Sequence, residues 1–173
     1  MLLASYKSTR PGLQGIANRI IRWRLRGTYS HSEIVFEPGD VPGHLLPDGT
    51  SRPDDAGALW SVSSVAAERL PDWSRRRAGE MGGVRFKRIG FDPMRWDTVR
   101  VRDADPMDAL VLARRMEGTA YDWHQVAGYA SWLIPQDPER VSCAELCAML
   151  LGLIDPWRFD PCVLHAALTT QAK

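Results

Sequence analysis

A cysteine at the start of a predicted helix is the residue of this sequence best placed to do chemistry. Cys143 lies in the segment 141–146 (VSCAEL), where Ser142 and Glu145 have the Ser-x-x-Glu spacing of a helix capping box. The unpaired backbone N–H groups at a helix start stabilise a thiolate, which is the nucleophilic form of cysteine, and they can also hold an oxyanion. A buried cysteine that merely follows a helix cap is the alternative interpretation.

A nucleophilic cysteine needs a general base, and the sequence offers four histidines: His31, His44, His124 and His165. The best candidate is His31, because it lies in the predicted strand 30–36 and a strand holds a side chain rigidly. Alternation along that strand places His31, Glu33 and Val35 on one face. A histidine on a solvated strand face is the simpler alternative. The other histidines fall in a loop rich in Pro and Gly or on predicted helices.

A third group would orient the imidazole for proton transfer. Glu33 shares the strand face of His31, but residues two apart on a strand are roughly 7 Å from each other. Direct contact therefore requires the glutamate side chain to bend back. Ser61 or Ser63, on the next predicted strand, could reach across instead. The sequence leaves the choice among these three residues open.

The periodicity of apolar residues predicts the elements that must position these side chains. Strands are expected at 2–6, 30–36, 58–64, 83–89 and 96–101. Helices are expected from Leu13 to a stop at Gly27, from Pro106 to a stop at Gly118, at 123–133 and at 142–151, with another starting at Asp160-Pro161. The strands at 83–89 and 96–101 alternate apolar and polar residues, which predicts that they pair antiparallel. Strands dominate the middle of the chain and helices the C-terminal half. This segregation predicts an α+β fold with an antiparallel sheet packed against helices.

The composition is that of a globular protein. The chain has 173 residues, of which 45% are hydrophobic and 25% charged, and we expect a single domain over 1–173. A net charge of +1 predicts no nucleic-acid partner and no overall attraction to anionic membranes. Three cysteines are too few for a disulfide scaffold. No apolar run approaches the ~20 residues of a membrane span, and no signal peptide is visible, so a cytoplasmic location is expected.

Two other kinds of protein share parts of this pattern. A zinc site is one, because zinc accepts a Cys3His set and the sequence contains a Cys-x3-Cys pair and a Cys-x2-His pair: Cys143, Cys147, Cys162 and His165. A binding protein is the other, with a groove formed by some of the seven tryptophans or by the arginine-rich segment 19–26. Ordinary core packing of Cys147 and the aromatic rings, and a solvated helix face at 19–26, explain the same features.

The order of the motifs resembles the circularly permuted branch of the NlpC-type papain-like cysteine peptidase superfamily. The motifs are, in order, SHSEIVF at 30–36, GGVRFKRI at 82–89, the Tyr-Asp-Trp of 121–123 and SCAELC at 142–147. In that branch the histidine strand precedes the cysteine helix, the reverse of papain. The segment MGGVRFKRI, with Trp96 downstream, is also similar to short phage-encoded relatives of the branch.

The resemblance implies a cysteine hydrolase that works through a thioester acyl-enzyme. Cys143 would be the nucleophile and His31 the general base, with Glu33 or Ser63 as the orienting group. Tyr121 and Ser142 would contribute to the substrate cleft. Substrates of this superfamily are amide bonds of cell-wall peptides, other isopeptides, or acyl esters of lipids, and no metal or organic cofactor is required. The alternative is a weakly active or inactive papain-like fold that serves as a binding or virion-associated protein, or is released at lysis.

Overall fold

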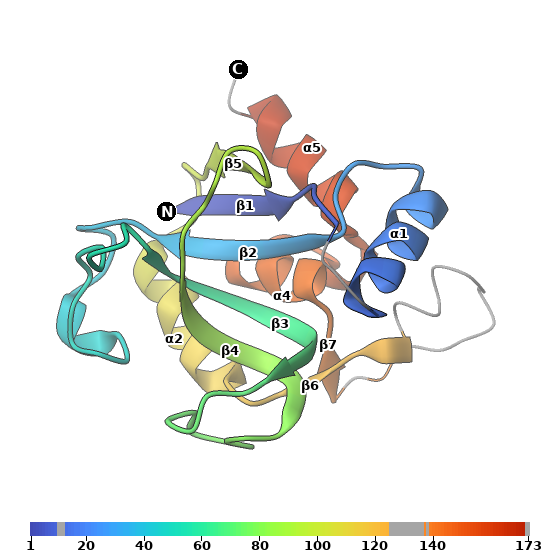
Figure 1. Cartoon of the computed structure of the whole chain (residues 1–173). Helices are drawn as coiled ribbons and strands as arrows, with labels where there is room; N and C mark the ends of the chain where they lie inside the picture. Colours follow the sequence, from blue (N-terminus) through green and yellow to red (C-terminus); the bar gives the residue numbers. More distant parts are fainter. Residues whose placement is uncertain (10–12, 125–136, 138, 172–173) are drawn as a thin grey trace.

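A five-stranded antiparallel sheet forms the centre of the computed structural model, which describes residues 1–9, 13–124, 137 and 139–171 (Figure 1). The strands are β1 (Leu2–Tyr6), β2 (His31–Phe36), β3 (Leu59–Arg69), β4 (Met81–Ile89) and β5 (Trp96–Arg100). Their order across the sheet is β4-β3-β2-β1-β5, and each neighbouring pair is antiparallel. The strand that carries His31 therefore lies in the middle of the sheet.

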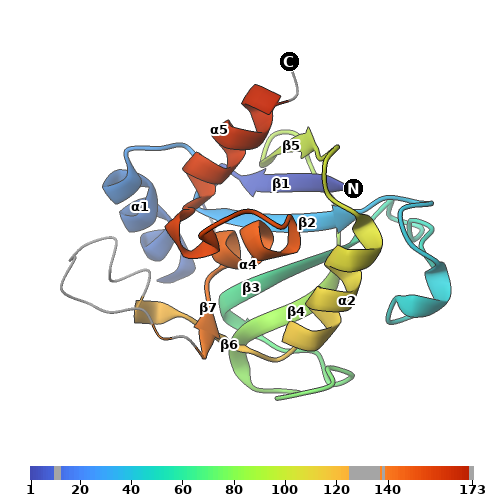
Figure 2. The same ribbon diagram turned by 180° about the vertical axis from the view of Figure 1, so that it is seen from behind.

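The described residues also form four α-helices and a second, very small sheet. The helices are α1 (Leu13–Leu25), α2 (Pro106–Met116), α4 (Cys143–Leu150) and α5 (Pro161–Gln171). Strands β6 (Ala120–Tyr121) and β7 (Arg140–Val141) pair in parallel, and short 3-10 turns lie at Gly43–Leu45 and Pro156–Arg158. Figure 2 shows α4 lying across β2 and β3, with α2 and α5 on the same side of the sheet. The predicted α+β architecture is confirmed at this level.

The main core fills the space between the sheet and these helices. Alternate strand residues point to this face, so Leu3, Ile34 and Phe86 pack against α4 residues such as Leu146. A smaller cluster lies on the opposite face: Ala4, Tyr6, Val35 and Trp96. The strand alternation places His31 and Glu33 on the face of this second cluster, away from the large apolar core.

Three predictions about the elements need correction or fall outside the described residues. Strand β3 runs to Arg69 rather than ending at residue 64, and it forms a long hairpin with β4 that includes a register shift. The predicted pairing of 83–89 with 96–101 is wrong, because β5 pairs with β1 at the other edge of the sheet. Trp96 packs edge-on against Tyr6 there, with ring centroids 4.9 Å apart. The predicted helix 123–133 lies outside the described residues from residue 125 onward.

Among the described residues, none of the helices combines the length and apolar character that crossing a membrane requires.

Candidate active site

The start of α4 is built as the sequence predicts. Ser142 is the N-cap: its Oγ accepts the backbone N–H of Glu145 at 3.3 Å, and the Glu145 carboxylate accepts the backbone N–H of Ser142 at 3.4 Å. This capping box makes Cys143 the first residue of the helix. Ser142 is 2% exposed and its hydroxyl is part of the cap, and its predicted role in binding substrate stays a prediction.

The cap leads to a stability prediction. We expect Ser142→Ala to lower the free energy of unfolding by about 1 kcal/mol, because the backbone N–H of Glu145 loses its acceptor, the Ser142 hydroxyl. Ser142→Asp, which keeps an oxygen acceptor at the N-cap, should retain most of that stability. Urea unfolding followed by circular dichroism measures both variants. Equal stability of the alanine variant and the wild type would show that the cap contributes nothing.

Cys143 and His31 interact through their side chains. Burial by itself raises the pKa of the Cys143 thiol, but His31 and the backbone N–H groups of Ser32 and Ala144 stabilise the thiolate, and the net pKa is lowered. For His31, burial lowers the pKa, but the interactions with Cys143 and then Glu33 prevail and raise it to about 9. Cys143 is 5% exposed and the His31 side chain 13%. A thiolate–imidazolium pair is therefore favoured in a site with little water.

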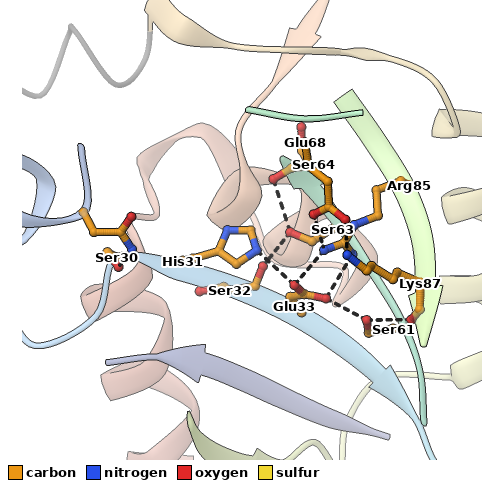
Figure 3. Close-up of polar contacts among 11 residues, drawn as sticks. Ser30, His31, Ser32, Glu33, Ser61, Ser63, Ser64, Glu68, Arg85 and Lys87 are labelled. Atoms are coloured by element: carbon orange, nitrogen blue, oxygen red, sulfur yellow. Dashed lines mark hydrogen bonds and ion pairs between the residues drawn. The ribbon is translucent and has the colours of Figure 1, made fainter. Parts of the chain in front are cut away.

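Glu33 contacts the imidazole of His31 directly. Its Oε1 lies 3.1 Å from Nε2 of His31, which leaves Nδ1 as the ring nitrogen for proton exchange with Cys143. Burial favours the protonated form of Glu33, but the charges and hydrogen bonds of Arg85 and His31 lower the pKa of this carboxyl far below its ordinary value. Figure 3 shows the carboxylate of Glu33 between the imidazole and Arg85. An ionised carboxylate in this position fixes the imidazole and supports its positive charge.

Arg85, which the sequence does not predict to be part of the site, holds Glu33 in place. Its guanidinium donates to both carboxylate oxygens of Glu33, at 3.1 and 3.0 Å, and to Glu68 at 3.4 Å. Glu68 is also paired with Lys87. The Arg85 side chain is 1% exposed, and such a buried arginine is rare without carboxylate partners. The only signal in the sequence is an arginine on the polar face of an alternating strand, which does not reveal its partner.

The serines of β3 support this network without contacting the imidazole. Ser61 donates to Oε2 of Glu33 at 2.6 Å. Ser63 donates to the backbone carbonyl of Ser32 at 2.7 Å, so it does not orient His31, contrary to one of the sequence alternatives. The cause lies in the sheet, because β2 and β3 pair only from Ile34 onward. At the start of β2, the backbone carbonyl of Ser32 therefore accepts from the Ser63 hydroxyl, and its backbone N–H donates to the Cys143 sulfur.

Tyr121 lies near the cysteine but inside the structure. It is 7% exposed, and its ring packs on Trp123 with centroids 5.3 Å apart. Its strand β6 pairs with β7, where Tyr121 is the partner of Val141, two residues before Cys143. Tyr121 thus supports the segment that leads into α4, and its predicted contact with substrate stays a prediction.

A groove on the sheet face that carries His31 is lined by residues that lie next to His31 and Glu33, among them Trp96 and Arg85. Its volume is about 660 Å³, and its lining includes Thr9, Arg85, Lys87 and Trp96. The Trp96 ring lies 6.3 Å from the His31 ring, centroid to centroid.

The four residues of the zinc hypothesis do not form one cluster. The Cys143 sulfur faces His31 and the Cys147 sulfur the backbone N–H of Ile34. On α5, Cys162 donates to the carbonyl of Tyr29, and His165 contacts Ser5 and the Tyr29 hydroxyl. No group of three or more metal-binding side chains occurs among the described residues. The two pairs therefore have separate partners, and the zinc interpretation has no support in this structure.

Comparison of the chain with protein-family models, with curated proteins and with solved structures finds no match.

Proposed function

We propose that this chain is a cysteine hydrolase that cleaves an amide or ester bond through a thioester acyl-enzyme. The observation that carries the proposal is an imidazole, only 13% exposed, that contacts a helix-start cysteine on one side and an ionised carboxylate on the other. Cys143, His31 and Glu33 would then act as nucleophile, base and positioning residue.

In the proposed reaction, Nδ1 of His31 takes the thiol proton of Cys143 and the thiolate attacks the carbonyl carbon of the substrate. Backbone N–H groups at the start of α4 stabilise the oxyanion. The imidazolium returns its proton to the leaving amine or alcohol, and a thioester remains on Cys143. Water, deprotonated by His31, then attacks the thioester and releases a carboxylic acid together with the free thiol.

The resemblance of the motif order supports a permuted NlpC-type papain-like fold for this enzyme, with a phage-encoded origin. It favours cell-wall peptides, other isopeptides or lipid acyl esters as substrates. The groove beside His31 and Trp96 is the proposed path by which such a substrate approaches the pair. A cytoplasmic or virion-associated location belongs to the same proposal.

The test is the pH dependence of alkylation by iodoacetamide, followed separately for each cysteine by mass spectrometry. We expect Cys143 to react readily below pH ~7, because a free thiol has a pKa of ≈ 8.5 and that of Cys143 is lowered. Cys162 is the internal reference, since burial raises its pKa, and it should react only in alkaline solution.

A stoichiometric burst of product from an activated ester would show the acyl-enzyme directly, with Cys143→Ser as the control. Identical pH profiles for Cys143 and Cys162, together with no burst, would contradict the proposal. That result would favour the alternative of an inactive fold that serves in binding.

A further inference from the structure

The N-terminal part of the chain has charges of one sign only. Its first thirty-two residues contain no Asp or Glu and six basic residues: Lys7, Arg10, Arg19, Arg22, Arg24 and Arg26. The net charge of the whole chain is nevertheless only +1, because the remainder of the chain has more acidic than basic residues. Three of these six residues lie in α1, and Arg26 follows the helix directly.

The outward face of α1 combines these charges with large apolar side chains. Trp23 is 79% exposed and Ile20 is 56% exposed. Because successive helix residues are about 100° apart, the order around the helix is Arg19, Trp23, Ile20, Arg24. An apolar centre is therefore flanked by an arginine on each side. Such an arrangement is typical of a helix that lies in a membrane interface.

The inward face of α1 attaches the helix to the end of the sheet. Asn18 donates to the Ser30 hydroxyl at 2.8 Å, and Arg22 donates to the carbonyl of Lys7 at 2.6 Å. Ser30 immediately precedes His31, and Figure 1 shows α1 beside the end of β2 where His31 lies. Among the described residues, no carboxylate pairs with Arg19 or Arg24. The two arginines thus remain available to an anionic surface outside the protein.

We propose that the outward face of α1 binds an anionic lipid membrane. Trp23 and Ile20 would enter the boundary between headgroups and acyl chains, and Arg19 and Arg24 would contact lipid phosphates. A nucleic acid would satisfy the arginines but would offer no apolar medium to Ile20. The proposal depends on α1 alone and stands whether or not Cys143 is a nucleophile. If both proposals hold, the membrane places lipid-borne substrates near His31.

The test is cosedimentation of the full chain with phospholipid vesicles. We expect binding to vesicles that contain about one-third phosphatidylglycerol, and little binding to pure phosphatidylcholine. Arg19→Gln/Arg24→Gln should weaken the partition coefficient about thirtyfold, since each surface arginine contributes roughly fivefold. Trp23→Ala should weaken it about tenfold, because its burial in the interface is lost.

Matched controls distinguish an effect of the outward face of α1 from an effect of the total charge. Arg102→Gln/Arg115→Gln removes the same charge at exposed positions elsewhere, and Trp157→Ala removes a tryptophan that is 46% exposed. These variants should bind vesicles nearly as the wild type does. Equal losses in the control and α1 variants would overturn the proposal, as would absence of binding to anionic vesicles or tighter binding to duplex DNA at the same salt concentration. Alkylation of Cys143 is unaffected by any of these outcomes, which keeps the two proposals distinguishable.

Discussion

Replacement of His31 by alanine is expected to slow the alkylation of Cys143 about hundredfold or more at pH ~6. In the wild type the imidazolium of His31 stabilises the thiolate and lowers the pKa of Cys143. Without it, the thiol returns at least to the pKa of ≈ 8.5 of a free cysteine, of which well under ~1% is ionised at that pH. Burial of Cys143 opposes ionisation further, so the loss should be at least this large.

The matched control for this variant is His44→Ala, which removes an exposed histidine in the loop before β3. It should leave the alkylation profile unchanged. A profile for His31→Ala that coincides with the wild type would show that the helix start alone activates the cysteine. The thiolate absorbance in the ultraviolet, recorded against pH, gives a second measurement that does not depend on access of the reagent.

The pH dependence of the wild type follows from the same pair. His31 has a pKa raised to about 9, so its imidazolium persists through neutral pH and is lost as the pH rises through that value. Hydrolysis that needs the imidazolium as acid should therefore decline above pH ~9, after rising at low pH as Cys143 ionises. The imidazolium also stabilises the folded protein. This contribution is complete below a pH of about 6.5, the ordinary pKa of a histidine, and it is lost as the pH rises through about 9.

The largest effect on stability is expected for Arg85→Met. This change leaves Glu33 buried and ionised without its guanidinium partner, and loss of one member of a buried ion pair costs about 3–5 kcal/mol. Urea unfolding at neutral pH measures the loss. Lys87→Met is the matched control, since Lys87 is on the same strand but half exposed, and it should cost less than about 1 kcal/mol.

A double variant separates the structural role of Arg85 from its role in the site. Glu33→Gln/Arg85→Met removes both buried charges, and it should recover much of the stability lost in Arg85→Met. Alkylation of Cys143 at pH ~6 should nevertheless remain slower than in the wild type, because no carboxylate supports the imidazolium. The stability difference between Arg85→Met and the wild type should also shrink as the pH falls and Glu33 is protonated in the variant. A double variant as unstable as Arg85→Met would contradict this account.

Local sequence was sufficient for the elements whose signals lie within a few residues. The capping box of Ser142 and Glu145 placed Cys143 at a helix start, and the structure confirms that position. Alternation along 30–36 placed His31 and Glu33 on one face. Alternation did not decide whether the two side chains touch, because the separation of roughly 7 Å along a strand is a spacing of backbone atoms and not of side-chain ends. Ser61 and Arg85 hold the long Glu33 side chain where it reaches the imidazole.

The sequence by itself determined the residue types, the helix that begins at Cys143 and the strand that carries His31, because capping and alternation act over a few residues. Only the tertiary structure decided three contacts: β5 pairs with β1, the Ser63 hydroxyl donates to the backbone carbonyl of Ser32, and Arg85 donates to the Glu33 carboxylate. Those contacts depend on strand order and on where β2 and β3 separate. Strand order results from competition among whole edges for hydrogen bonds and buried area, and no short segment contains that information.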